Sequence, residues 1–408
     1  MTDERAEDTP KPVPTGIELT ALDPVFRADP YPVLTTLRGR EPVHYDQAIH
    51  RWVLTRAQDI ERVLRDRGMS VDPRKANAGT YMSIFQRFGV FSMLFQDPPN
   101  HTRLRGLVSK AFTVRAVERL APRIRQIVDE LLAAVDGTAR FDAIEALAGP
   151  LPVIVIAEML GVDPADRQDF KRWSDAEALG LNPLLTAEEM ATTAQLGAEL
   201  AAYLERTIAA RRAQPRDDLI SDLIAVEEAG DRLSDDEIVT MCELLLVAGN
   251  VTTTDLIGNG IWLLLRHPEE LQKLRRDPAL IANAVEEILR FESPVVQTGR
   301  IAMDEIEIGG CPIHRGESVL TLLAAANRDP AEYPEVDRFD VTRRDVHHRS
   351  FGGGAHFCLG APLARLEGQI AIAAFVERFP RARLADEPLE WRAFPAFRGL
   401  ARLPVVTS

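Results

Sequence analysis

The longest helical pattern in the chain lies between residues 235 and 266. Apolar side chains recur there at intervals of three or four residues, from Ile238 to Leu265, which is the spacing of one helix face. Ser234 and Glu237 form a capping-box pattern before this run, and Pro268 closes it. The pattern therefore predicts a helix of about 30 residues, roughly 45 Å long.

The middle of this predicted helix contains residues that disfavour helices. The stretch LLLVAGNVTTTDLIGNG, residues 244–260, holds three glycines and three consecutive threonines. Each glycine costs about 1 kcal/mol relative to alanine, and threonine hydroxyls can bond back to carbonyls one turn earlier and bend the helix. Two interpretations are open at this point. Small residues could allow another helix to cross closely, or the stretch could form a functional site.

Similar patterns predict that most of the chain between residues 57 and 290 is helical. The expected helices are 100–113, 115–135, 150–160, 164–176, 187–212, 217–228, 235–266, 268–275 and 279–291, with a further helix from about Leu359 to just before Pro380. β-rich parts are expected near 42–56, 294–325 and 383–408. The fold class is thus mainly α with a smaller β part. We expect a flexible arm at 1–18 and a single domain at 19–408.

Composition narrows the functional classes. The 408 residues carry 48 basic and 62 acidic side chains, a net charge of −14, which argues against nucleic-acid binding. No stretch reaches the 18 or so apolar residues of a membrane span, and the acidic, proline-containing N-terminus does not resemble a signal peptide. The three cysteines include no CxxC pair, so no disulfide framework is expected. These features predict a cytoplasmic protein that does not associate with a membrane.

The strongest chemical signal surrounds Cys358. The stretch FGGGAHFCLGAPLARLEG, residues 351–368, places this cysteine just before a predicted helix, whose free N–H groups would stabilise a thiolate. A thiolate is a nucleophile or a metal ligand. His356 could serve a nucleophile as base, whereas a zinc site would need further ligands that are not nearby. Haem needs a single protein thiolate, because the macrocycle fills the other positions. An inert buried cysteine is the remaining interpretation.

The same loop resembles the haem-binding loop of the cytochrome P450 family. Its pattern F-x-x-G-x-H-x-C-x-G is matched at all five specified positions by residues 351–360. Further stretches resemble other family motifs, in the same order along the chain, and the similarity covers about residues 20–405. These stretches are DPPNHTRLR at 97–105, AGNVTT at 248–253, EILR at 287–290, AANRDP at 325–330 and RF at 338–339.

The resemblance implies a fold and a cofactor. The family fold is a triangular α-rich prism that holds haem b between the long central helix and the helix following the cysteine loop. Cys358 would be the axial thiolate that binds the iron, within a loop that includes Phe351, Gly352 and Gly360. Phe351 would shield the sulfur. The haem propionates would be bound by a set of cationic and imidazole side chains: His101, Arg105, Arg300 and His356.

A second implied set has a structural role. Glu287 and Arg290 lie three residues apart, on one helix face. By resemblance they bond with Arg338 and lock the irregular segment behind the haem. A solvated surface pair is the usual alternative for such spacing.

In the central helix the resemblance implies a site for oxygen activation. Gly249 would let the helix pass against the haem, Ala248 would leave room for oxygen, and Thr252 would donate a proton. The family usually has Asp or Glu immediately before this threonine, but here the residue is Val251. We therefore expect a different acid. The candidates that we consider are Asp255, one turn further on, together with Asn250 and Glu367.

The expected substrate pocket is apolar. The family lines it with the 74–96 segment, the central helix, the strand after residue 294 and the C-terminal turn. The corresponding residues here are Tyr81, Phe85, Phe88, Phe91, Leu244, Val247, Val295, Val296, Phe394 and Phe397. Gln297, Thr298 and Arg398 could anchor a polar group. The composition of the pocket indicates a hydrophobic small molecule, although ordinary core packing would also explain several of these aromatic residues.

The sequence thus favours a haem-thiolate monooxygenase that inserts one atom of O₂ into such a molecule. The family implies that electrons come from NAD(P)H through a reductase and an iron–sulfur ferredoxin. The ferredoxin would dock near Arg103, Arg105, Lys110 and Arg365. We expect a monomer. The two alternatives are a peroxide-driven haem-thiolate peroxygenase, suggested by the missing acid, and a non-enzymatic haem sensor or carrier.

Overall fold

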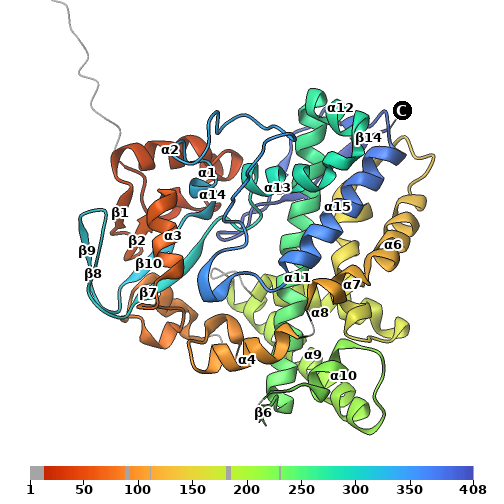
Figure 1. Ribbon diagram of the computed structural model, residues 1–408, viewed down its shortest axis with the longest axis horizontal. Coiled ribbons are helices and arrows are strands. Elements are labelled where there is room, and N and C mark those ends of the chain that lie inside the picture. Colours follow the sequence, from red (N-terminus) through yellow and green to blue (C-terminus); the bar gives the residue numbers. More distant parts are fainter. Residues whose placement is uncertain (1–12, 88–91, 111, 181–184, 229–230, 408) are drawn as a thin grey trace, which may run out of the picture.

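The protein consists of a large helical part and a smaller part built on β-sheets (Figure 1). The computed structural model describes residues 13–87, 92–110, 112–180, 185–228 and 231–407. In the view of Figure 1 the N-terminal helices and the largest sheet lie on the left, and the helices from α6 onwards lie mainly on the right. The long helix α11 passes through the helical part with α15 beside it.

The helices in the first half of the chain are α1 (Pro24–Ala28), α2 (Tyr31–Arg40), α3 (Ala57–Arg65), α4 (Asn100–Ser109), α5 (Val114–Glu118), α6 (Ala121–Ala133), α7 (Pro150–Met159) and α8 (Arg167–Gly180). Those in the second half are α9 (Ala187–Ala213), α10 (Leu219–Ala225), α11 (Asp235–Arg266), α12 (Pro268–Arg276), α13 (Ile281–Phe291), α14 (Leu323–Ala326) and α15 (Ala361–Arg378).

The strands form one sheet of five strands and several small sheets. The large sheet has the order β1 (Val43–Asp46), β2 (Arg51–Leu54), β10 (Ser318–Thr321), β7 (Thr298–Ala302) and β3 (Met69–Ser70), with β10 parallel to β2 and the other pairs antiparallel. The small sheets comprise β11 (Arg383–Leu384), β14 (Pro404–Val406) and β4 (Arg140–Asp142); β12 (Glu390–Trp391) and β13 (Leu400–Arg402); β5 (Glu227–Glu228) and β6 (Asp231–Arg232); and β8 (Ile306–Ile308) and β9 (Cys311–Ile313).

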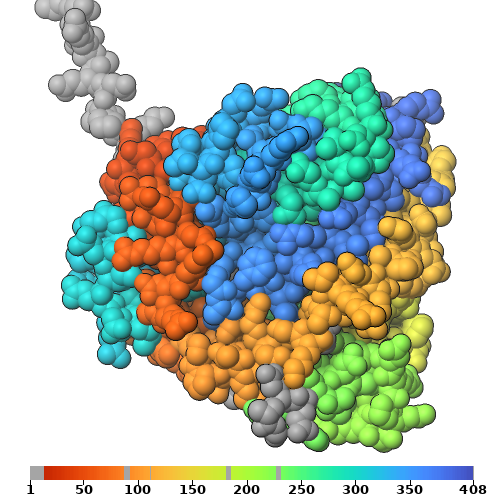
Figure 2. Space-filling view, viewed as in Figure 1, coloured from red at the N-terminus to blue at the C-terminus, as the bar shows by residue number. Residues whose placement is uncertain are grey.

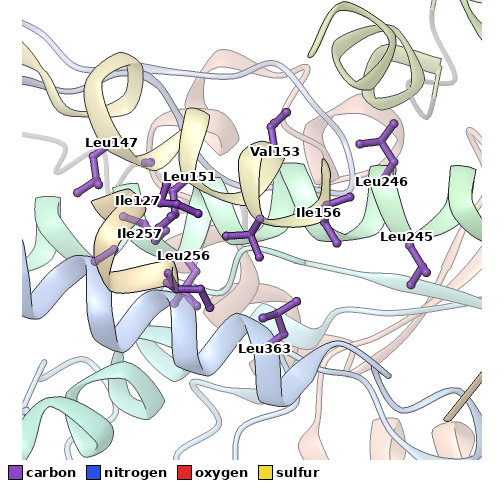
Figure 3. Close-up of a cluster of buried hydrophobic side chains, with 14 of the residues drawn as sticks. Ile127, Leu147, Leu151, Val153, Ile156, Leu245, Leu246, Leu256, Ile257 and Leu363 are labelled. Atoms are coloured by element: carbon purple, nitrogen blue, oxygen red, sulfur yellow. The ribbon is translucent and has the colours of Figure 1, made fainter. Parts of the chain in front are cut away.

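The main core lies around α11. Most of its side chains are buried, and they pack against α6, α7, α13 and α15 in one apolar cluster. Figure 3 shows α7 against one side of α11, with Leu363 of α15 on the other side. Ser234 forms the predicted capping box with Glu237, and α11 ends before His267, so the bounds predicted from the sequence are confirmed.

Several predicted boundaries are wrong. The expected helix 115–135 is two helices, α5 and α6, with α6 starting after Leu120 and carrying a proline in its first turn. The expected helix 217–228 ends at Ala225, where the chain enters the short strand β5. The expected arm is fixed by residue 15, because Thr15 and Gly16 both donate hydrogen bonds to the buried carboxylate of Asp46.

The segment between α14 and α15 is irregular, as predicted. Residues 327–360 contain a single 3-10 turn, at Gly354–His356, in place of longer elements. In Figure 2 the blue part of the chain that includes this segment fills the surface between the orange N-terminal part and the helices on the right. It carries Cys358 to the N-terminus of α15.

Candidate functional site

The backbone around Cys358 is built from glycines. Gly352 and Gly354 have positive φ angles of 69° and 64°, a region that favours glycine. A Cβ at Gly354 would also collide with the carbonyl oxygen of Leu64 in α3. The Cys358 N–H donates to the carbonyl oxygen of Phe351 at 2.9 Å, which closes the loop. The chain can therefore turn tightly against α3 and present the thiol.

The Cys358 sulfur is bonded to the start of α15 and open on one side. The N–H groups of Gly360 and Ala361 donate to it, and Arg105 and Arg365 lie close enough to favour the thiolate. Burial of the thiol outweighs these effects and raises its pKa. Yet the side chain is exposed on its remaining face. A buried thiol with one open face and two backbone donors fits a metal ligand, since a bound cation would favour its ionised form.

Four predicted side chains meet beside this loop. The imidazoles of His101 and His356 lie in contact, with their ring centroids 4.0 Å apart and their planes tilted by 36°. Burial, together with the charges of His101, Arg300 and Arg105, lowers the pKa of His356 to about 3. Burial also lowers the pKa of Arg300 to about 10. These groups repel one another's positive charge, so the cluster is suited to receive an anion.

The cluster also has a free hydrogen-bonding atom. His101 is almost wholly buried in α4, and its Nε2 has no partner among the described residues. Arg105 donates to the carbonyl oxygen of Phe357 at 2.7 Å, and Arg300 donates to Gly299 and Thr298 within its own strand. A buried polar atom without a partner calls for a ligand. The carboxylates of haem b would satisfy the charge and this atom, so the residues fit the group implied by the sequence.

The predicted structural triad has a different third member. Glu287 and Arg290 are completely buried and paired at 2.6 Å. The guanidinium of Arg343 donates to Glu287 at 3.2 Å, whereas the Arg338 side chain is half exposed and pairs with Glu335 and Asp340. Arg338 contributes only its carbonyl oxygen to Arg290. The assignment of Arg338 as third charged partner is therefore wrong, because the chain curls five residues further before a side chain turns inward.

Two neighbouring turns of α11, around Ala248 and Thr252, are partly exposed. From Leu245 to Leu264 every residue is buried except Ala248, Gly249 and Thr252. The Thr252 hydroxyl donates to the carbonyl oxygen of Ala248 at 2.7 Å, the back-bonding expected from the sequence. The helix nevertheless stays α-helical throughout. Ala248 and Thr252 thus form an open strip on an otherwise covered helix.

Gly249 and Asn250 serve packing. A Cβ on Gly249 would lie 3.1 Å from Cγ1 of Ile156 in α7, the residue that Figure 3 shows beside α11. The Asn250 amide is buried and donates to Ser174 of α8 at 2.7 Å. The small residue and the amide thus help to fix the crossings with α7 and α8, while their expected roles, against the haem for Gly249 and in proton transfer for Asn250, stay predictions.

Asp255 is buried and bonded to the C-terminal part of the chain. Its Oδ1 accepts a hydrogen bond from Arg392, and a Cβ on Gly399 would collide with its carboxyl. Burial raises the pKa of Asp255 to about 6 although Arg392 lowers it. No pattern in the sequence indicates this partner, which is 137 residues away.

The described members of the expected substrate pocket lie on three parts of the chain: the segment around Tyr81, the helix α11 and the C-terminal segment. Tyr81 stacks edge-on against Phe85 and accepts a hydrogen bond from Gln297, and Phe394 contacts Phe397. Val247 is buried on α11 and Leu244 is half-buried there. Phe88 and Phe91 lie outside the described residues.

Two pocket assignments are corrected. Val296 is buried in the cluster under α1 and α2, since successive residues of an extended chain point to opposite sides and Val295 is the one that bridges to Phe397. Arg398 is not a free anchor, because its guanidinium is buried and paired with Glu292.

Among the described residues no three His, Cys, Asp or Glu side chains come together as a metal site. None of the helices in that part of the chain is long and apolar enough to cross a membrane.

Comparison with known proteins identifies the family. The family model described as cytochrome P450 matches residues 184–388. The cytochrome P450 monooxygenase PikC of Streptomyces venezuelae is 42% identical over 96% of this chain and 94% of its own length. The 6-deoxyerythronolide B hydroxylase of Saccharopolyspora erythraea is 41% identical, over 93% of this chain and 96% of its own. The structure of the bacillaene polyketide synthase cytochrome P450 PksS of Bacillus subtilis is 39% identical, with a TM-score of 0.89 over 95% of this chain and 99% of that one.

Proposed function

Because the chain belongs to the cytochrome P450 family and is a P450 monooxygenase with haem b as its cofactor, we propose that it oxidises a hydrophobic small molecule. The reaction is hydroxylation or epoxidation, in which one atom of O₂ enters the substrate and the other leaves as water. Electrons come from NAD(P)H through a reductase and a ferredoxin. The observation that carries the proposal is Cys358, held by two backbone donors with one face open.

Each part of the site has a role in this proposal. Haem b supplies the activation of O₂. Cys358 binds its iron, and the donors from Gly360 and Ala361 keep the sulfur oriented. His101, Arg105, Arg300 and His356 bind the propionates, which satisfies the free Nε2 of His101. Thr252, on the open strip of α11, holds and passes a proton at its hydroxyl.

The substrate class follows from the residues near the open strip. In this proposal the substrate contacts Leu244, Val247 and Ala248 on α11 and the aromatic pairs Tyr81–Phe85 and Phe394–Phe397, which are almost wholly apolar. Two relatives have names that refer to a polyketide synthase or to 6-deoxyerythronolide B. Both lines support a large hydrophobic scaffold of that kind as the first substrate to test.

The ferredoxin docks on the cysteine side in this proposal. Its expected contacts are partly neutralised within the chain, since Arg103 pairs with Glu237 and Arg365 pairs with Glu286 at 2.6 Å. Arg105 takes part in the cation cluster. We therefore expect ferredoxin binding to weaken with salt less steeply than a fully unpaired basic patch would predict.

The first test is spectroscopic. The dithionite-reduced haem protein with carbon monoxide should show a strongly red-shifted Soret band, and Cys358→His should move the band to the position of ordinary haem proteins. A wild-type band at that ordinary position would refute thiolate ligation. A matched control is Cys311→Ser, because Cys311 lies on the small sheet β8–β9 away from the loop.

The second test measures the reaction. Candidate scaffolds that shift the haem spin state are incubated with NAD(P)H, ferredoxin reductase, ferredoxin and O₂ labelled with heavy oxygen. One labelled atom per product molecule supports the proposal. Product formed with hydrogen peroxide alone, and not with the redox partners, would replace it with the peroxygenase reaction that Val251 suggests.

A further inference from the structure

We propose that Asp255 is the acid that supplies protons to Thr252 in this chain, and that solvent reaches it along the seam between α11 and residues 391–399. The inference rests on the proposed function, because it concerns proton supply for oxygen activation at the same site. It also accounts for a chain that keeps the threonine while residue 251 is a buried valine.

The carboxyl of Asp255 is enclosed by one segment of the C-terminal region. Arg392 donates to Oδ1 from the end of β12, and the Gly399 backbone, just before β13, leaves no room for a Cβ beside that oxygen. The side chain is 1% exposed. Asp255 therefore faces the seam with residues 391–399 rather than the crossings with α7 and α8.

The pair leaves two hydrogen-bonding atoms unused. Oδ2 of Asp255 and Nε of Arg392 are buried and have no partner among the described residues. Buried polar atoms in folded proteins are almost always bonded to protein or to water. An acceptor and a donor on the same ion pair are suited to bind one internal water molecule, which needs two or more polar partners. The seam thus offers the carboxyl a route for proton exchange.

The outer end of this route is a surface cavity. Its volume is about 10 Å³, room for roughly one water molecule, and it lies between α1, α2 and the C-terminal segment. Trp391, Arg392, Arg398 and Gly399 all line it. Arg392 and Gly399 are also the two residues that touch Asp255. The same two residues therefore separate the buried carboxyl from a surface cavity that has room for about one water molecule.

The inner end is Thr252. Residues three apart on a helix are neighbours on its surface, and Asp255 follows Thr252 by three residues in an unbroken part of α11. The Thr252 hydroxyl is already turned toward Ala248 on the open strip. A proton passes from the Asp255 carboxyl, through water, to the Thr252 hydroxyl, which gives its own proton to the oxygen being reduced. The Asp255 carboxylate then regains a proton from solvent, and the electrons come from the redox partner.

Burial gives Asp255 a suitable acidity, since its pKa of about 6 keeps both forms populated near neutral pH. Arg392 is the charged group that faces it from the C-terminal segment. The competing acid is Glu367 of α15, whose pKa burial raises to about 8. Glu367 is not among the described residues that line the cavity, whereas Arg392 and Gly399, which contact Asp255, do line it, so Asp255 has the better access to solvent.

The experiment uses the holoenzyme with ferredoxin, reductase and NAD(P)H, without an organic substrate, and follows O₂ consumption in H₂O and in D₂O. Asp255→Asn should slow consumption about tenfold or more and enlarge the ratio of the two rates. Gly399→Ala, which crowds the carboxyl without removing it, should do the same to a smaller extent. Arg402→Gln is the control on the same segment, because that side chain is exposed at 67%.

A readout without turnover accompanies these rates. The infrared difference spectrum of wild type minus Asp255→Asn, recorded on the ferric holoprotein, should show a protonated carboxyl band that disappears with a midpoint near pH 6. If Asp255→Asn loses the haem, Gly399→Ala carries the test. Its infrared band should shift relative to wild type.

The outcomes separate the two proposals. If wild type lacks the red-shifted carbon monoxide band, the proposed function fails. If wild type shows the band and consumes O₂, but Asp255→Asn and Gly399→Ala keep the wild-type rate and isotope ratio, only the proton route is overturned. A loss in Glu367→Gln with Asp255→Asn unchanged would overturn it in the same way.

Discussion

Two buried ion pairs flank the functional site, and they differ in how completely they are bonded. Both oxygens of Glu287 accept hydrogen bonds, from Arg290, Arg343 and the Asp340 N–H. Asp255 has one bonded oxygen and one free. A buried network with every atom bonded fixes structure, whereas an unused atom beside an accessible cavity keeps a group able to exchange protons. By this criterion Glu287 has a structural role, and Asp255 is the acid that is able to exchange protons.

The largest effect should come from breaking the complete pair. Arg290 joins Glu287 to the carbonyl oxygens of Asn327, Val336 and Arg338, so it ties α13 to the irregular segment. Arg290→Met removes the main partner of a buried carboxylate, which keeps only Arg343 and the Asp340 N–H, and should cost about 3–5 kcal/mol in unfolding free energy. Urea unfolding of the carbon monoxide complex measures it.

Two further variants test whether Arg343 or Arg338 is the third charged partner of Glu287. Arg343→Met removes a bond to the same carboxylate and should cost less than Arg290→Met, while Arg338→Ala should stay within about 0.5 kcal/mol of wild type because its side chain is half exposed. Equal costs for Arg338→Ala and Arg343→Met would contradict the assignment of Arg343 as the third partner.

The ion pair of Asp255 with Arg392 should make the free energy of unfolding depend on pH. Asp255 has a folded-state pKa of about 6 against an ordinary value of 3.8, so the folded protein holds a proton that the unfolded chain releases between these values. The stability contributed by this proton is present at low pH and is lost as pH rises through about 6. Asp255→Asn removes the titration.

The measurement compares unfolding free energies of wild type and Asp255→Asn from pH 4 to pH 7. We expect the difference to change by about 2–3 kcal/mol in favour of the variant as pH rises. A pH-independent difference would mean that Asp255 is already ionised across this range and is a structural partner of Arg392 like Glu287 of Arg290.

How far the sequence could predict these features depends on whether the signal was local. The capping residues Ser234 and Glu237 gave the start of α11, and the glycines around Cys358 gave the turn that presents the thiol. These are rules that act within a few residues.

The errors came from long-range geometry. The resemblance points to Arg338, whereas Arg343 contacts Glu287, because residues 327–357 have no period that indicates which side chain turns inward. Arg392 was not found as the partner of Asp255, because nothing in a pattern joins residues 137 positions apart. Packing between distant elements decides such pairs, and propensity does not describe it.

A smaller effect tests the packing of α8 on α11. The Asn250 amide and the Ser174 hydroxyl are buried and bonded at 2.7 Å. Ser174→Ala leaves the amide without this partner and should cost about 1–2 kcal/mol. In a double-mutant cycle with Asn250→Ala, the two costs should not add, and the carbon monoxide band should stay red-shifted. Additive costs would mean that the bond contributes nothing of its own.

The smallest and most discriminating effect is at Gly249, where packing and function compete as explanations. Alanine in a helix gains about 1 kcal/mol over glycine, but here its Cβ would lie 3.1 Å from Cγ1 and 3.3 Å from Cδ1 of Ile156. We expect Gly249→Ala to be slightly destabilising in the wild-type background. In an Ile156→Ala background the crowding is gone, so the same change should stabilise the protein by up to about 1 kcal/mol. If Gly249→Ala instead costs the same in both backgrounds and alters the carbon monoxide band, the glycine keeps space for the cofactor, and the open strip of α11 extends from Ala248 to residue 249.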